Sequence, residues 1–139
     1  MLLSLVTPKK KFVTNLSVER VTLPAFKGQL TVLPGHSPLV TTLSTGVVKF
    51  KDSTTGTDHE FFVTWGYCEV GKNGIVVLAE TAEAKSEINV ERAKKALQNA
   101  SAQLKNRTLD PKLIEKHRRK FVRAKARLDF AGTNSQTTH

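Results

Sequence analysis

Residues 75–97 read IVVLAETAEAKSEINVERAKKAL, and within this stretch one residue pattern gives way to another. Up to about residue 85 the chain holds short β-branched and aromatic runs, whereas beyond it apolar residues recur every three or four positions. The first pattern is typical of strands and the second of amphipathic helices. The change predicts an α+β chain with an N-terminal antiparallel β-sandwich over residues 1–85. A two-helix antiparallel hairpin over 86–131 and a flexible tail over 132–139 follow.

Six runs before residue 85 have the length and composition of strands. They cover residues 3–5, 16–18, 30–32, 47–50, 61–63 and 75–78. Turn signals separate them, and at one of these Asn73-Gly74 suits the positive φ of a tight hairpin between strands ending near Val70 and starting at Ile75. Many short strands at this spacing favour a β-sandwich or a flattened barrel.

Two apolar stripes after residue 85 predict two helices. The stripes are Val90, Ala93, Leu97, Ala100 and Leu104, then Ile114, His117, Phe121, Ala124 and Leu128. Asn89 suits the N-cap of the first helix, and Asp110 followed by Pro111 suits the start of the second. The short polar link over 106–108 makes the two helices antiparallel neighbours.

Charge is distributed unevenly over the 139 residues. The chain carries 22 Lys and Arg against 12 Asp and Glu, a net charge of +10. Residues 1–85 hold 9 and 7 of these, whereas residues 86–139 hold 13 and 5, so the hairpin carries +8 of the net charge. A basic chain favours nucleic acid, an anionic membrane or an acidic protein as its partner.

Length and composition indicate one compact domain with an appendage. The single cysteine excludes an internal disulfide, so the fold depends on a packed core of ordinary hydrophobic content, 39% of residues. The apolar residues near the N-terminus stop at Thr7-Pro8, which is too short for a signal peptide or a membrane span. We therefore expect a soluble, untargeted chain.

Residue chemistry gives little support for catalysis. The four histidines are His36, His59, His117 and His139. None has a metal-ligand spacing to another His or Cys, and Cys68 has no basic neighbour in sequence that would stabilise its thiolate. Glu80, Glu83 and Glu87 fit solvated junction residues better than an acid–base pair, and no phosphate-binding loop or nucleophile elbow is present. We expect no catalytic residues and no metal site.

One flank of the second helix is strongly basic. Positions three and four apart place Lys116, Arg119, Lys120, Arg123 and Arg127 on it together. Three interpretations fit this flank. It is a solvated helix face, a surface that binds the phosphates of a nucleic acid, or a surface that binds the carboxylates of an acidic protein. A basic helical-hairpin nucleic-acid-binding protein is thus the alternative function, although no nucleic-acid recognition motif accompanies the basic residues. The chemistry of these residues alone does not decide which anionic partner the flank binds.

The loop over residues 33–39 reads LPGHSPL. Two prolines and one glycine surround a polar histidine, with apolar residues on both sides. Such a loop has a defined shape, so a structural turn and a docking site are equally good interpretations.

Taken together, these motifs resemble the ε subunit of bacterial and chloroplast F-type ATP synthases, the equivalent of the mitochondrial δ subunit. The matching stretches are VTP (6–8), GQLTVLPGHSPL (28–39), GVV (46–48), GYCEV (66–70), VVLAETAE (76–83) and INVERA (88–93). They run in order over nearly the whole chain and end near residue 131. The resemblance implies a β-sandwich of about ten strands followed by a helical hairpin.

The resemblance also implies a function and partners. Such a subunit is a non-catalytic part of the rotating central stalk, where the sandwich holds the γ subunit and sits on the membrane ring of c subunits. The implied docking residues are Gln29, Thr31, Pro34, Gly35 and His36. His36 aligns with a position that lies against γ. Gln29 stands where an acidic residue facing the c ring is usual, and Thr31 stands where glycine is usual.

The implied hairpin is a regulatory element. It folds down on the sandwich or extends along γ into the catalytic head of α and β subunits, where it restrains ATP hydrolysis. Its implied target is an acidic loop of a β subunit. The residues implied to contact this loop are Lys116, Arg119, Lys120 and Arg123.

Several bacterial members of this family bind ATP as a regulatory ligand through a motif at the start of the first helix and two arginines on the second. The matching residues here are Glu83, Ile88, Asn89, Arg92, Ala93, Arg123 and Arg127. Asn89 replaces the usual Asp, and Asn99 stands where an Arg is frequent. The resemblance thus implies no required cofactor, with ATP as an optional ligand.

The resemblance to this family also implies that the chain has no nucleic-acid partner. The implied location is the cytoplasmic face of the bacterial membrane, where the subunit is held only through the complex.

Overall fold

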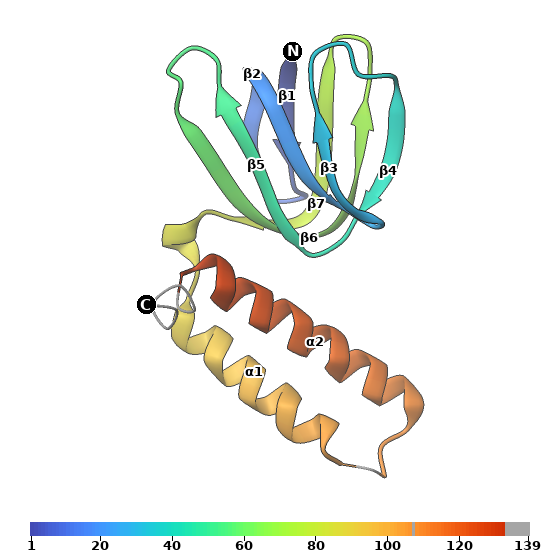
Figure 1. Ribbon diagram of the computed structural model, residues 1–139. Coiled ribbons are helices and arrows are strands. Elements are labelled where there is room, and N and C mark those ends of the chain that lie inside the picture. The colour runs from blue at the N-terminus through green and yellow to red at the C-terminus, as the bar shows by residue number, and fades with distance from the viewer. Residues whose placement is uncertain (107, 133–139) are drawn as a thin grey trace. The chain divides into compact units, whose positions relative to one another are not determined.

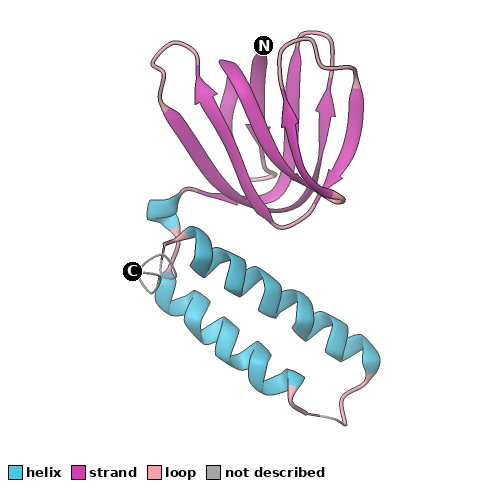
Figure 2. Cartoon of the chain, in the orientation of Figure 1, coloured by secondary structure: helices cyan, strands magenta, loops and turns pink. Residues whose placement is uncertain are grey.

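The computed structural model describes residues 1–106 and 108–132, so Arg107 of the predicted link and residues 133–139 of the predicted tail, His139 among them, lie outside the described residues. The chain divides into two compact units, Met1–Ala84 and Lys85 onward. The first unit holds β1 (Leu2–Val6), β2 (Lys11–Ala25), β3 (Gly28–Val32), β4 (Leu39–Leu43), β5 (Gly46–Asp52), β6 (Asp58–Val70) and β7 (Gly74–Glu83). The second holds the 3₁₀ turn η1 (Lys85–Glu87), α1 (Val90–Leu104) and α2 (Pro111–Phe130). Figure 1 labels these elements and Figure 2 colours them by type.

The seven strands of the described chain form one hydrogen-bonded sheet that closes on itself. Strand β1 pairs with β2 and with β7, and the circuit returns to β2 through β6 and β5. Strand β4 lies between β6 and β2, and β3 extends the sheet from β2. The predicted sandwich or flattened barrel is confirmed (Figure 2). One pairing departs from the expected antiparallel arrangement, because β1 and β7 run parallel.

Two long strands replace several of the expected short ones. Strand β2 has 15 residues and β6 has 13. Residues 58–63 of β6 pair with β5, whereas residues 66–70 pair with β4. At the junction of these pairings Trp65 has a φ of 48° and Gly66, the first residue paired with β4, has a φ of 146°, so the strand changes partners without ending. The resemblance implies about ten strands, and the described residues form seven. The count is lower because a long strand such as β6, which pairs with β5 in one part and with β4 in the other, is one continuous strand.

Apolar side chains that alternate along the strands fill the interior of the sandwich. Large side chains with at most 1% exposure include Leu3, Leu5, Val21, Leu23 and Val63. Cys68 is also fully buried, and burial, with the nearby charge of Glu69, raises the pKa of its thiol to about 12. A thiol with such a pKa stays protonated and unreactive at neutral pH, as expected for a structural cysteine.

The Asn73-Gly74 turn lies where the sequence predicts it, between β6 and β7, but not for the predicted reason. Gly74 does not have a positive φ; it is already paired with Leu2 of β1. A Cβ at this position would lie 2.5 Å from the Leu2 carbonyl oxygen. Glycine is needed here because the neighbouring strand approaches closely, which a prediction from turn propensity misses.

Both helices of the second unit begin at the predicted residues. The Asn89 side chain accepts a hydrogen bond from the backbone N–H of Arg92 at 3.0 Å, and Asp110 accepts one from Lys112 at 2.9 Å. Pro111 occupies the first turn of α2. These caps satisfy N–H groups that the helices cannot satisfy internally.

The two predicted stripes face inward. Ala93, Ala100, Ala124 and Leu128 are buried, and the other stripe residues are half-buried. Helices α1 and α2 pack against each other as the predicted antiparallel hairpin (Figure 1). No helix among the described residues combines the length and the apolar character that crossing a membrane requires.

Candidate functional site

The Leu-Pro-Gly-His loop predicted as a docking element is a type II turn. The His36 backbone N–H donates to the Leu33 carbonyl oxygen at 3.1 Å, and Gly35 has a φ of 87°. Pro34 supplies the fixed φ of the first central position, and glycine supplies the positive φ of the second. Nδ1 of His36 lies 2.7 Å from the Ser37 carbonyl oxygen. Because a carbonyl oxygen can only accept, Nδ1 carries the proton and donates, which leaves the other ring nitrogen for a partner.

The five predicted docking residues belong to two adjacent parts of the chain, β3 and the turn that follows it. Pro34, Gly35 and His36 follow the end of β3, whereas Gln29 lies beside its start, next to the β2–β3 turn. Gln29 and Thr31 share the exposed face of β3, two residues apart. The predicted docking set thus extends along the exposed face of β3 and into the turn that follows the strand.

Most of the residues predicted to bind a nucleotide lie at one end of the hairpin, which we call the open end. Antiparallel packing places the start of α1, with Asn89 and Arg92, beside the end of α2, with Arg123 and Arg127. A cation–π contact between Lys85 Nζ of η1 and the Phe130 ring of α2, 5.6 Å from the ring centroid, lies at the same end of the hairpin. The remaining members differ in environment: Ile88 and Ala93 are buried, and Glu83 ends β7 in the sandwich unit.

The two polar groups at the start of α1 are differently engaged. The Asn89 amide oxygen is used by the helix cap, whereas the Arg92 side chain is exposed. The replacement of the expected Asp by Asn thus preserves the cap. It also removes the negative charge that an Asp would place at this end of the hairpin.

Arg123 has an unsatisfied donor. Its side chain is half-buried, and its Nε atom is buried without a hydrogen-bond acceptor among the described residues. A buried N–H of this kind loses hydration and gains nothing in return, at a free-energy cost of roughly 1–3 kcal/mol. An anionic acceptor brought to Arg123 would recover that loss.

The basic flank predicted on α2 is divided by burial. Lys116, Arg119 and Lys120 are exposed, whereas Arg123 and Arg127 are half-buried toward the end of the helix. The predicted flank thus combines three exposed cations with two half-buried ones.

An exposed ion pair lies next to this flank. Arg118 pairs with Glu115, at 3.5 Å between Nη1 and Oε2. A pair this exposed contributes little stability. The outer part of the flank therefore stays open to a partner.

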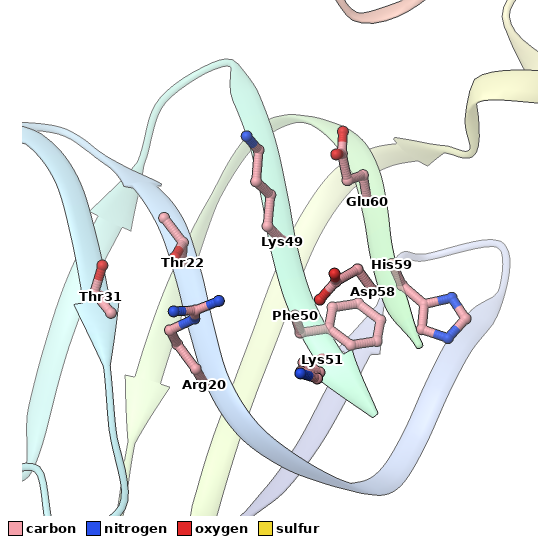
Figure 3. A pocket seen from close by; sticks show the side chains of 9 residues that line it. All are labelled: Arg20, Thr22, Thr31, Lys49, Phe50, Lys51, Asp58, His59 and Glu60. Carbon is pink, nitrogen blue, oxygen red and sulfur yellow. The ribbon is translucent and has the colours of Figure 1, made fainter. Parts of the chain in front are cut away.

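Within residues 1–106 and 108–132, no group of three or more His, Cys, Asp or Glu side chains is placed to hold a metal ion. A shallow cavity of about 330 Å³ lies on the outer surface of β2, β3, β5 and β6. Its lining combines the Phe50 ring with polar side chains that include Arg20, Thr31, Lys49 and Glu60 (Figure 3). Of the predicted docking set, Thr31 alone lines this cavity.

Sequence reasoning missed one feature, an exposed apolar face on β4, β6 and β7. Val40, Tyr67 and Val76 expose 68%, 47% and 41% of their surface. A signal was present in the sequence: the run Ile75–Leu78 is continuously apolar, which is typical of a strand covered on both faces.

Comparison with known proteins agrees with this architecture. Residues 1–85 match the family model described as ATP synthase, Delta/Epsilon chain, beta-sandwich domain, and residues 86–132 match that of its long alpha-helix domain. A protein of Bdellovibrio bacteriovorus named ATP synthase epsilon chain is 36% identical over 131 residues, 94% of each chain. One of the same name from Trichlorobacter lovleyi is 39% identical over 95% of this chain and 94% of its own.

Solved structures share the fold at lower identity. A chain in the mitochondrial ATP synthase of Euglena gracilis superimposes with a TM-score of 0.72 at 20% identity, covering 100% of this chain and 81% of that one. A chain in the central stalk and c-ring structure from Tetrahymena thermophila gives 0.58 at 19% identity, covering 89% and 92%. Two family models in the right order and relatives matched over nearly their full length lead to one conclusion: the chain belongs to the ATP synthase Delta/Epsilon chain family.

Proposed function

We propose that the chain is a non-catalytic subunit of the central stalk of an F-type ATP synthase. In this role it couples the catalytic head to the ring of c subunits. The observation that carries the proposal is the match of both family models, in order, to the sandwich and the hairpin over residues 1–132. The subunit would lie at the cytoplasmic face of a bacterial membrane as a peripheral protein, held there through the complex.

The proposed partners of the sandwich are the γ subunit and the c ring. The rigid turn at Pro34–Gly35 presents His36 toward one partner, and the exposed face of β3 presents Gln29 and Thr31. Gln29 lies near the start of β3 and His36 follows its end, which suits contact with two different subunits.

Binding to the γ subunit tests this proposal directly. The full chain, mixed at micromolar concentration with a cognate γ subunit, should elute with it as one complex in size-exclusion chromatography. A Kd in the micromolar range or below corresponds to about 8 kcal/mol or more of binding free energy. Separate elution at these concentrations would reject the stalk function.

The proposed role of the hairpin is to restrain ATP hydrolysis. Its exposed cations, among them Lys116, Arg119 and Lys120, suit the carboxylates of an acidic loop on a catalytic β subunit. A hairpin that packs in two alternative positions is a two-state element, and any ligand that binds one state better shifts the population.

ATP is the proposed ligand of the open end of the hairpin. The unsatisfied Nε–H of Arg123 and the exposed guanidinium of Arg92 are donors that fit phosphate oxygens. Asn89 would continue to cap α1, and Ile88 and Ala93 would hold the helix start in place by their burial. ATP would act here through its affinity for one hairpin state, without undergoing a reaction.

Calorimetry on the isolated full chain measures this binding. Replacing Arg123 or Arg92 by Ala should weaken ATP binding about tenfold, or roughly 1.4 kcal/mol, because each change removes one charge-assisted donor. Arg118→Ala is the matched control, because its ion pair with Glu115 lies elsewhere on α2 and its loss should leave the affinity unchanged. An absence of heat at millimolar ATP would contradict the ligand assignment.

A further inference from the structure

The outer face of β2, β3, β5 and β6 holds a cavity whose charged residues have no part in the functions proposed above. The residues that these strands turn toward the interior, among them Val21, Val48 and Phe50, are buried. Polar residues that alternate with them point outward and surround a space of about 330 Å³ (Figure 3). This volume lies at the lower end of the range for small-molecule sites. The cavity therefore suits a small ligand.

The charged side chains of the cavity are sorted by strand. Arg20 comes from β2, and Lys49 and Lys51 come from β5. Asp58 and Glu60 come from β6. The register places Lys49 directly opposite Glu60, and Lys51 directly opposite Asp58. The β2 and β5 side of the cavity is thus cationic and the β6 side anionic, and the three cations exceed the two carboxylates by one charge.

These five charged groups are not neutralised within the chain. None of them forms an ion pair with a residue that the structure describes, although opposite charges face each other across β5 and β6. Arg20 lines the same cavity as the two lysines, and like charges that share a site repel each other. An anion between Arg20 and the lysines would remove this repulsion. Thr22, directly opposite Lys49, offers a hydroxyl donor to the same anion.

We propose that this cavity binds a small ligand in which a phosphate group and an ammonium group are joined by a short link. The Arg20 guanidinium would hold the phosphate through two parallel hydrogen bonds, and the lysine ammonium groups would add charge. Asp58 and Glu60 would accept hydrogen bonds from the ammonium group of the ligand. The site is built on the sandwich strands and shares no residue with the ATP site proposed for the hairpin.

The spacing of the strands determines the length of the link. Neighbouring strands lie roughly 5 Å apart, which is also the distance between the lysine positions of β5 and the carboxylate positions of β6. A two-carbon link between phosphate and ammonium spans a similar distance. At neutral pH such a compound carries a net charge of about −1, which balances the excess cation of the cavity. Inorganic phosphate would instead place its excess negative charge near two carboxylates.

O-Phosphoethanolamine is the smallest probe with this chemistry. We expect it to shift the amide resonances of β2, β5 and β6 in ¹⁵N–¹H spectra of the full chain. The shifts should saturate, with a Kd of roughly 1 mM or below, as the size of the ligand allows. Inorganic phosphate and ethanolamine each carry half of the probe's chemistry and should bind about tenfold more weakly or worse.

Substitutions in the cavity separate the two halves of the ligand. Arg20→Gln should weaken the binding of O-phosphoethanolamine and of inorganic phosphate about tenfold, because both lose a bidentate donor. Glu60→Gln should have opposite effects on the two ligands. It removes a partner of the ammonium group and weakens O-phosphoethanolamine binding, but it also removes a repulsive charge and strengthens inorganic phosphate binding.

Lys27→Gln is the matched control for the arginine variant. Lys27 is exposed in the β2–β3 turn and does not line the cavity. Its replacement removes the same single charge as Arg20→Gln and should leave both affinities unchanged. A loss of affinity in this control as large as that of Arg20→Gln would show that the net charge of the chain, and no built site, attracts the ligand, which would overturn the proposal.

The same chemistry occurs free in solution and in the headgroup of an ethanolamine phospholipid. Sedimentation with phosphatidylcholine vesicles that contain or lack phosphatidylethanolamine distinguishes these sources, because the quaternary ammonium of choline cannot donate hydrogen bonds. If the source is a lipid, the full chain should sediment only with the ethanolamine-containing vesicles, and Arg20→Gln should abolish this. If the source is a soluble compound, the amide shifts should occur without sedimentation on either vesicle.

Three further results would overturn the proposal. One is the absence of saturable shifts in the cavity strands, and another is a set of shifts confined to α1 and α2. The third is equal affinity for inorganic phosphate, with Glu60→Gln strengthening both ligands, since the cavity would then accept any anion. All of these measurements use the free chain, so none of their outcomes bears on its binding to γ.

Discussion

Replacing Gly66 by alanine is expected to prevent the sandwich from folding. Gly66 has a φ of 146°, in a region open essentially only to glycine. A Cβ there would overlap the Leu78 carbonyl oxygen and lie 2.9 Å from the Cα atom of Ala79. Both atoms belong to the backbone of β7, which pairs with β6 on either side of this point and cannot move away alone. We expect a loss of more than roughly 4 kcal/mol, comparable to the whole stability of a small domain.

Urea denaturation followed by circular dichroism measures this effect, with Gly56→Ala as the matched control. Gly56 also has a positive φ, 72°, but nothing lies within 4 Å of the position of its Cβ. The control should therefore lose only about 1 kcal/mol, the usual penalty for a left-handed backbone. Equal midpoints for the two variants would contradict the steric explanation.

Local signals in the sequence were sufficient for the hairpin. The N-caps at Asn89 and Asp110 depend on a side chain and a backbone N–H two or three residues away, so their geometry follows from the adjacent sequence alone. The apolar stripes were predictable for the same reason, because helical spacing decides which residues face inward.

The parts that the sequence did not predict all depend on contacts between distant segments. Gly74 and Gly66 are needed because Leu2 and Leu78 approach them across the sheet, which no turn rule can reveal. The bend at Trp65 arises because β6 exchanges β5 for β4 as its partner. The spacing of α2 places Arg123 among surface cations, and only the folded structure shows that its Nε is buried.

The candidate sites divide in the same way. Residues of the open end were brought together by antiparallel helices, which the short link over 106–108 already implied. The docking set is instead spread along β3 and the turn after it, so its members are close in sequence but extend over the length of a strand. Sequence proximity predicts spatial proximity within a turn and fails along an extended strand, where each residue advances about 3.3 Å.

Removing the hairpin is expected to raise ATP hydrolysis by the assembled synthase. Deletion of residues 86–139 takes away 13 Lys and Arg against 5 Asp and Glu, while Met1–Ala84 forms a compact unit of its own that should still bind γ. If the hairpin holds the head in an inactive state, its loss should release a coupling free energy of typical size, a gain of roughly tenfold to a hundredfold in hydrolysis. A coupled ATPase assay on the reconstituted complex measures this gain.

Charge reversal identifies which part of the hairpin is responsible. A triple variant that changes the exposed cations of α2 to glutamate should reproduce much of the gain, because it turns attraction to an acidic loop into repulsion. Its substitutions are Lys116→Glu, Arg119→Glu and Lys120→Glu. The control set changes the net charge equally at exposed positions outside α2 and should leave inhibition intact; its substitutions are Lys94→Glu, Lys95→Glu and Lys105→Glu. Equal activation by both sets would mean that net charge alone restrains hydrolysis. Unchanged hydrolysis after the deletion would reject the inhibitory role, because a restraint that the hairpin imposes must disappear with it.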